Sequence, residues 1–265
     1  MKETLLINEN HLLEINTSNI LNEPFPHYLI DDFFKKEVAE KLESEFPDFN
    51  SDIWHIYKNP IEVKKTCNNW NQFPNLTYKV FTLLNSRNFT GYISSNLFKD
   101  MPLYPDYGLH GGGWHIHGRG GKLNTHLDYS IHPKLKKQRK LNLIVYLNSN
   151  WQRSWGGKLG FWSNKSTNEP DSLVKEIEPI FNRAVLFDTS LNSWHGLPSK
   201  IKCPEDEFRK SIAVYYLTNP AENVAKRSRA LFSPNKEQKN DEEVLKLIKM
   251  RSDELNVQKS YQKDV

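Results

Sequence analysis

The chain has 265 residues, of which 37% are hydrophobic and 26% are charged, and its formal net charge is +4. This length and composition predict one elaborated folded domain, and the 12% aromatic content excludes a disordered, fibrous or low-complexity protein. The mild positive charge gives no reason to expect a nucleic-acid partner. No stretch approaches about 18 consecutive apolar residues, so no membrane span is expected.

The N-terminal residues and the cysteines indicate a compartment. The apolar run within the first ten residues is too short for a secretory leader. Cys67 and Cys203 are isolated from each other in the sequence, and in a non-secreted chain such cysteines are expected to be reduced thiols. The expected compartment is therefore the cytoplasm.

Residues 1–99 are predicted to be a helical flank of the domain that follows. Residues 25–32 favour a short strand, and Asp32 is expected to cap the next helix. The apolar residues of that helix recur at a spacing of four, which places them on one face: Phe34, Val38, Leu42 and Phe46. Pro47 is expected to end it, and two further amphipathic helices are predicted after Pro74.

Residues 100–220 have the texture of a β core. A glycine-rich segment at 108–121 precedes four apolar, β-branched runs that turn residues separate. These runs are residues 141–147, 158–162, 183–187 and 211–217. Short strands with this spacing predict a sandwich or barrel. The predicted fold class is therefore mainly β with flanking helices.

Two basic or polar segments outside these runs are predicted to be peripheral. Residues 134–140 contain four lysines and Arg139, and we expect a solvated loop there, with a substrate-steering rim as the alternative. Residues 221–265 are expected to be a C-terminal linker and helix. Within them, 226–240 form a polar linker, and Asp241 can cap a last amphipathic helix.

A histidine and an aspartate stand two residues apart in the predicted core. His126 and Asp128 flank Leu127, and in a strand residues i and i+2 project to the same face. His195 follows a later predicted strand and a turn. Two histidines and one carboxylate in this order are the ligand set that occupies one face of iron(II) and leaves the opposite positions open. We therefore predict that His126, Asp128 and His195 are the catalytic metal site.

The open positions of such a site suit a 2-oxo acid and dioxygen. The far carboxylate of 2-oxoglutarate then needs a fixed cation, and Arg209 stands at the head of the predicted strand at 211–217. The planar fork of an arginine suits a bidentate grip on a carboxylate. A hydroxyl group beside it would complete the co-substrate site, and Tyr146 and Ser211 are the available choices.

A second histidine pair lies just ahead of the predicted ligands. His115 and His117 also have the spacing of a metal-binding pair, but the other triad already forms a complete set. We expect the glycine-rich segment around them to be a pocket wall or a mobile lid, or else a plain connection.

These motifs resemble the prolyl-4-hydroxylase-like branch of the 2-oxoglutarate/Fe(II) dioxygenases. Residues 123–128 are similar to its first ligand motif, residues 141–148 to its central strand, and His195 with Gly196 to its second ligand segment. Residues 209–216 resemble its co-substrate strand. The family often places a tyrosine ahead of the first ligand motif, where this chain has residues 114–118, Trp-His-Ile-His-Gly.

The resemblance implies a fold, an activity and a set of cofactors. It implies a double-stranded β-helix (jelly-roll) core, Fe(II) as the metal, 2-oxoglutarate and dioxygen as co-substrates, and ascorbate as an accessory reductant. Tyr146 and Arg209 would hold the distal carboxylate of 2-oxoglutarate. The implied activity is hydroxylation of an unactivated C–H bond of a prolyl or other protein side chain.

Two alternatives stay open at this point. The same metal centre could serve an oxygenase acting on a small molecule such as an amino acid, a sugar or a lipid-linked intermediate, because loops read the substrate. The other alternative is a non-redox, cupin-like metal-binding barrel. Arg209 argues against the barrel, since a protein that does not use 2-oxoglutarate has no need of that cation.

Overall fold

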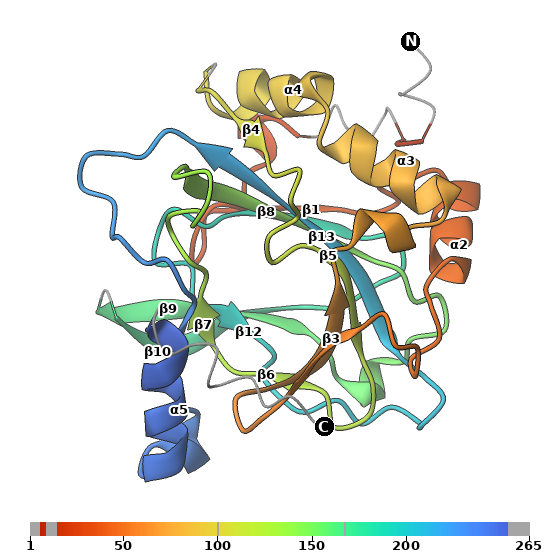
Figure 1. Cartoon of the computed structure of the whole chain (residues 1–265). Helices are drawn as coiled ribbons and strands as arrows, with labels where there is room; N and C mark the ends of the chain where they lie inside the picture. The colour runs from red at the N-terminus through yellow and green to blue at the C-terminus, as the bar shows by residue number, and fades with distance from the viewer. Residues whose placement is uncertain (1–5, 9–14, 100, 167, 254–265) are drawn as a thin grey trace.

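The computed structural model describes residues 6–8, 15–99, 101–166 and 168–253. Two antiparallel sheets face each other, and helices α2 (Lys36–Ser44), α3 (Asn75–Leu84) and α4 (Arg87–Leu97) cover the outer face of the larger sheet (Figure 1). Helix α5 (Glu242–Ser252) lies beside the smaller sheet. None of the described helices combines the length and hydropathy that crossing a membrane requires.

Among the described residues, the larger sheet has nine strands and the smaller has five. The larger sheet runs in the order β1-β11-β8-β13-β5-β3-β2, with β4 paired to β13 and β6 to β3. Its strands are β1 (His27–Ile30), β2 (His55–Lys58), β3 (Glu62–Cys67), β4 (Tyr104–Pro105), β5 (Gly113–His117), β6 (Lys122–Leu123), β8 (Gln138–Tyr146), β11 (Ala184–Asp188) and β13 (Arg209–Thr218).

The smaller sheet runs in the order β10-β9-β12-β7-β14. Its strands are β7 (His126–Leu127), β9 (Leu159–Ser166), β10 (Glu169–Ile177), β12 (His195–Gly196) and β14 (Leu231–Phe232). The two central strands, β7 and β12, are two residues long, and both begin at a histidine that was predicted to bind metal. The smaller sheet therefore brings these two histidines into the middle of the molecule.

The strands of the larger sheet separate an apolar face from a polar one by simple alternation. In β13, Ile212 and Val214 pack in the main hydrophobic core, together with residues of α2, α3 and α4. Ser211 and Ala213, which alternate with them, line a cavity on the opposite face. Because strand side chains alternate between faces, the same strand anchors the helices and furnishes the cavity.

Some local predictions are confirmed and others are wrong. Asp241 caps α5 as expected, since its side chain accepts hydrogen bonds from the backbone N–H groups of Glu243 and Val244. Asp32 does not cap α2. It adopts a positive φ of 49°, and the helix begins at Lys36 after a residue that makes no side-chain capping bond. The side chain of Asn182 holds the approach to α2 instead, accepting from the backbone N–H of Phe34.

The sequence also gave no sign of β2, β3 and β14. β3 reads Glu-Val-Lys-Lys-Thr-Cys, which lacks the apolar alternation of an ordinary half-buried strand. Its polar side chains Glu62, Lys64 and Thr66 line the cavity, so the inner face of this strand is polar. β14 lies within residues 226–240, where a linker was predicted, and pairs with β7.

Candidate active site

A cavity of about 340 Å³ lies between the two sheets. Its wall includes His126, Asp128 and His195 on the side of the smaller sheet, and Arg209 and Ser211 on the larger one. Small-molecule sites usually occupy about 300–1,000 Å³. The predicted metal ligands therefore share one cavity with Arg209 and Ser211, and its volume suits a small molecule.

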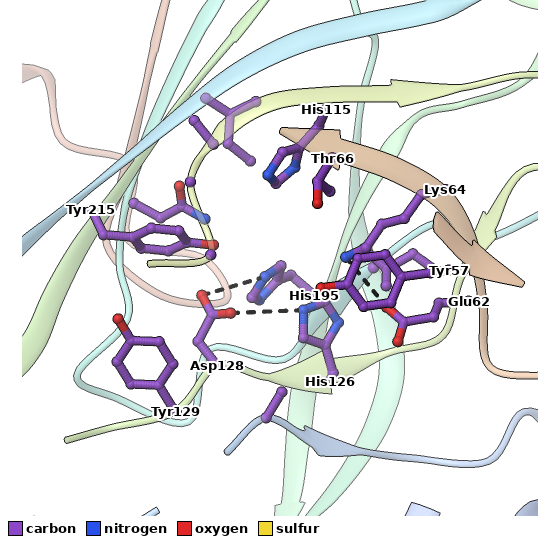
Figure 2. A pocket seen from close by; sticks show the side chains of 18 of the residues that line it. Tyr57, Glu62, Lys64, Thr66, His115, His126, Asp128, Tyr129, His195 and Tyr215 are labelled. Atoms are coloured by element: carbon purple, nitrogen blue, oxygen red, sulfur yellow. Dashed lines mark ion pairs between the residues drawn. The ribbon is translucent and has the colours of Figure 1, made fainter. Parts of the chain in front are cut away.

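The three predicted ligands converge because β7 and β12 are neighbours. His126 and His195 stand directly opposite each other in the antiparallel pair, and their ring centroids are 4.3 Å apart. Asp128 follows β7 and reaches both rings. Its Oδ1 lies 3.8 Å from His126 Nε2, and its Oδ2 lies 3.8 Å from His195 Nε2 (Figure 2). One ligand atom from each residue fits within 4.8 Å of the others.

Backbone hydrogen bonds orient both imidazoles. His126 Nδ1 is 3.0 Å from the carbonyl oxygen of Asn124, and His195 Nδ1 is 2.9 Å from that of Ser193. A carbonyl can only accept, so each Nδ1 carries the proton and each Nε2 keeps a lone pair. Burial lowers the pKa of His126 to about 3 and also lowers that of His195. Both rings are therefore neutral donors that point toward Asp128.

The carboxylate of Asp128 is ionised, and among the described residues only its Oδ1 pairs with a cation, Arg139. Burial alone would raise its pKa, but the neighbouring Arg139 guanidinium and the two histidines lower it below the ordinary value. Its Oδ2 is buried and has no hydrogen-bond partner among the described residues. A buried carboxylate oxygen without a partner is costly, and a bound cation would satisfy it. Two imidazole nitrogens and one carboxylate oxygen fit iron(II).

Arg139 is the site residue that the sequence analysis placed wrongly. It was expected in a solvated loop, but it lies in β8 with 2% of its surface exposed, and its Nη1 is 3.2 Å from Asp128 Oδ1. The guanidinium lies between the rings of Tyr129 and Tyr215, 3.4 Å from each centroid. Its Nη2 also donates to the carbonyl oxygen of His110 at 2.8 Å.

A bulge explains why the sequence pattern did not indicate Arg139. Asn142 and Ile144 of β8 line the cavity, and strict alternation would place Lys140 beside them. The register between β8 and β13 shifts, so that Leu217 pairs with Arg139 while Tyr216 pairs with Leu141. This irregularity turns Arg139 inward, because an extra residue in one strand reverses the faces beyond it.

The three predicted co-substrate residues also meet at one place. Ser211 stands opposite Tyr146 in the pairing of β13 with β8, and the guanidinium carbon of Arg209 lies 4.7 Å from the Tyr146 ring centroid. Arg209 is 4% exposed, and its Nε donates to the carbonyl oxygen of Gly157 at 2.6 Å. No described carboxylate lies within ion-pair distance of its guanidinium. Burial lowers the pKa of Arg209.

The strands that carry these residues match a known protein family. Residues 112–218, which contain all three predicted ligands and Arg209, match the model of the 2OG-Fe(II) oxygenase superfamily. Over this stretch the chain is similar to that superfamily. The match begins at Gly112, one residue before β5, and ends with β13, so it leaves out β14 and the cavity-lining strand β3.

A curated protein similar to this chain is the mouse prolyl 3-hydroxylase OGFOD1. The two are 30% identical over 86 residues, which is 31% of this chain and 15% of the relative. The chain therefore matches a small part of that protein's length.

Solved structures give the same fold. A prolyl hydroxylase from Trichoplax adhaerens, in complex with a hypoxia inducible factor peptide, has a TM-score of 0.52 at 16% identity, covering 78% of this chain and 87% of its own. A Pseudomonas putida prolyl-4-hydroxylase has a TM-score of 0.53 at 13% identity, covering 80% and 98%. The prediction of a mainly β, jelly-roll core with flanking helices is confirmed.

β5 carries two cavity-lining histidines in the region where the sequence resemblance led us to expect a tyrosine. His115 and His117 stand opposite Ser211 and Arg209 in the pairing of β5 with β13. Burial, followed by the charges of Lys64 and Arg209, lowers the pKa of His115 to about 3, so that ring is neutral. Neither nitrogen of the His117 ring has a hydrogen-bond partner among the described residues. The glycine-rich segment thus contributes a strand of the pocket wall.

The C-terminal segment is a second part of the site that the sequence did not indicate. Phe232 of β14 stands opposite His126, and the two rings stack with centroids 5.1 Å apart at 23°. Farther along, Arg251 of α5 forms an ion pair with Glu62, with Nη2 and Oε1 2.6 Å apart. Both contacts join elements distant in sequence, so no local pattern could have revealed them.

Proposed function

We propose that the protein is a 2-oxoglutarate- and Fe(II)-dependent dioxygenase that hydroxylates an unactivated C–H bond. One observation carries the proposal. In one cavity, an Asp128 oxygen without a hydrogen-bond partner lies beside two neutral imidazoles. In the same cavity, the buried guanidinium of Arg209 has no carboxylate partner among the described residues. A cation and a dianion would satisfy these groups together, and iron(II) and 2-oxoglutarate are that pair.

Each residue has a definite role in this proposal. His126, Asp128 and His195 hold the iron through two Nε2 atoms and one carboxylate oxygen. Arg209 binds the distal carboxylate of 2-oxoglutarate with its planar fork, and Tyr146 and Ser211 lie beside it to supply hydroxyl donors. Arg139 holds the other oxygen of Asp128, which fixes the carboxylate in place.

The bound iron and 2-oxoglutarate supply the oxidative chemistry, and the chain supplies position and exclusion of water. The cavity wall is closed on the metal side by Phe232, which is 5% exposed and stacks on His126. The neutral state of both ligand imidazoles keeps their lone pairs free for the metal at neutral pH.

We further propose residues 100–220 as the oxygenase core, with residues 1–99 as its flank and residues 221–265 as a linker and helix. The proposed substrate is a prolyl or other protein side chain, in line with the prolyl hydroxylases that the chain resembles. Dioxygen is the second co-substrate, ascorbate an accessory reductant, and the cytoplasm the proposed compartment. A small-molecule substrate is the alternative.

Anaerobic titration of the iron(II)-loaded protein with 2-oxoglutarate tests this function. We expect the weak visible metal-to-ligand charge-transfer band to form in the wild type and to be lost in His126→Ala. The matched control is His55→Ala, because His55 is an exposed histidine of β2 that lines the same cavity but lies outside the ligand set. If iron binds tightly and no band forms, the non-redox metal-binding barrel becomes the better assignment.

A further inference from the structure

The cavity wall carries a marked excess of positive charge. Its cationic side chains are Lys64, Arg139, Arg209, Arg229 and Arg251, and its carboxylates are Glu62 and Asp128. His110 in the wall does not add to the excess at neutral pH, since burial lowers the pKa of that ring to about 4. Iron(II) and the 2-oxoglutarate dianion cancel each other, so the excess persists after both have bound.

Two of the five cations have a partner assigned. Arg139 pairs with Asp128, and in the proposed function Arg209 receives the distal carboxylate of 2-oxoglutarate. Of the remaining three, Lys64 and Arg251 both pair with Glu62, which is 1% exposed, and Arg229 forms no ion pair with a described carboxylate. An excess of buried or half-buried cations is costly unless an anion joins them. The charges therefore predict a further anionic ligand in the cavity.

Lys64 is placed to meet that ligand. It projects from β3 into the cavity, toward His126 and His195 (Figure 2). Its Nζ is 3.3 Å from Glu62 Oε2, but the other oxygen of Glu62 already binds Arg251 at 2.6 Å. One carboxylate between two cations leaves a net positive charge beside the metal centre.

Lys64 and Arg209 project from different strands. β5 lies between β3 and β13 in the sheet. Neighbouring strands are about 4.8 Å apart, so the two backbones are separated by roughly 10 Å. That separation leaves room for two anions, one at each cation, in the same cavity.

Arg229 contributes a second cation to the cavity wall. It lies between β13 and β14 and is half-buried. Its Nε is buried and has no hydrogen-bond partner among the described residues. It is also close enough to His110 to lower the pKa of that ring further, after burial, Arg139 and His132. A guanidinium in the cavity wall that no described carboxylate pairs with suits an incoming carboxylate or phosphate.

We infer that the primary substrate carries an anionic group, a carboxylate or a phosphate, that Lys64 and Arg229 bind while the reacting carbon faces the metal centre. This inference rests on the proposed function and narrows its substrate class. It also extends the site beyond the superfamily match, because Lys64 precedes residue 112 and Arg229 follows residue 218.

Binding of four short probes to the protein loaded anaerobically with iron(II) and 2-oxoglutarate tests the inference. N-acetyl-prolyl-aspartate amide is compared with its asparagine analogue, and N-acetyl-prolyl-phosphoserine amide with its serine analogue. Calorimetry gives each dissociation constant, and the charge-transfer band reports the state of the metal site. We expect at least one charged probe to bind about tenfold or more tightly than its neutral partner. The pair of probes with the larger ratio of neutral to charged dissociation constants identifies the anion as carboxylate or phosphate.

Three variants locate the binding group. Lys64→Met and Arg229→Met are expected to reduce the preference for the charged probe to less than about threefold, with the affinity for 2-oxoglutarate unchanged. Lys58→Met is the matched control, since Lys58 is an exposed lysine of β2 outside the cavity lining. It should keep the full preference.

The outcomes separate this inference from the function on which it rests. If the band forms and no charged probe binds better than its neutral partner, including when none binds, the anionic substrate is wrong and the oxygenase assignment stands. A preference that survives in both methionine variants overturns the assignment of Lys64 and Arg229. A loss of 2-oxoglutarate affinity in Lys64→Met would show that this lysine binds the co-substrate, and it would also overturn the inference. If no band forms in the wild type, both proposals fall.

Discussion

Two buried arginines line the cavity of the candidate metal site and are held in opposite ways. Arg139 is 2% exposed, pairs with Asp128 at 3.2 Å and lies between two tyrosine rings. Arg209 is 4% exposed, has one backbone acceptor in Gly157 and lacks a carboxylate partner among the described residues. The two cations are thus similarly buried, but the protein neutralises only one of them.

This difference separates a structural charge from a ligand-binding one. A buried ion pair is costly to break because the remaining partner stays buried and uncompensated. An unpaired buried cation already carries that cost in the free protein, and a ligand anion relieves it. Arg139 should therefore matter most to the folding of the metal-free protein, and Arg209 to its affinity for an anion.

The largest expected effect is on folding. Arg139→Met should lower the free energy of unfolding of the metal-free protein by about 3–5 kcal/mol, because the carboxylate of Asp128 stays buried without its cation. Chemical denaturation followed by tryptophan fluorescence measures this loss. Arg153→Met removes an exposed arginine and is the control. A loss below about 1 kcal/mol would show that Asp128 does not depend on this pair.

Arg209→Met should act on binding instead. We expect the affinity for 2-oxoglutarate to fall about 30- to 4,000-fold, which corresponds to about 2–5 kcal/mol for removing one partner of a buried charge pair. The free energy of unfolding of the metal-free protein should stay the same or rise, since an unpaired buried charge has been removed. A loss of stability as large as that of Arg139→Met would erase the distinction between the two arginines.

The pH dependence of folding gives a third comparison. Burial, then the charges of Lys64 and Arg209, lowers the pKa of His115 from 6.5 to about 3 in the folded protein. The unfolded chain therefore binds more protons between these two pH values. The titration of His115 leaves the free energy of unfolding unchanged above pH 6.5 and decreases it as the pH falls from 6.5 toward 3. His115 alone adds at most about 1.4 kcal/mol per pH unit to the slope of the unfolding free energy against pH.

Denaturation of the metal-free protein at several pH values measures that slope. His115→Gln should make it shallower, and Arg209→Met should do so by a smaller amount, because removing one nearby positive charge raises the pKa of His115 only partly. An unchanged profile in His115→Gln would mean that other groups control the acid sensitivity.

The smallest expected effect concerns the hydroxyl beside Arg209. Tyr146→Phe should weaken 2-oxoglutarate binding by about two- to twelvefold, the worth of one hydrogen bond of about 0.5–1.5 kcal/mol. Tyr215→Phe keeps the ring that stacks on Arg139 and should leave this affinity unchanged. Equal effects of the two substitutions, measured by titration of the charge-transfer band, would contradict the placement of the co-substrate beside Tyr146.

The fold class and the ligand pair could be inferred from the sequence because both depend on short-range patterns. The apolar runs of β8, β11 and β13 show their strand character directly. Alternation alone places His126 and Asp128 on one face. The positions of Arg139, Phe232 and Lys64 could not be inferred in this way. A bulge turns the first inward, a late edge strand brings in the second, and a polar strand without apolar alternation carries the third.

The sequence by itself determined the apolar strands of the core, the flanking helices and the types of side chain available for metal and co-substrate, since propensity and periodicity act over a few residues. Tertiary structure decided which charges meet. It paired Asp128 with Arg139, left Arg209 without a carboxylate and divided Glu62 between Lys64 and Arg251. Charges interact through space and respond to burial, so their balance exists only once distant segments have packed around one cavity.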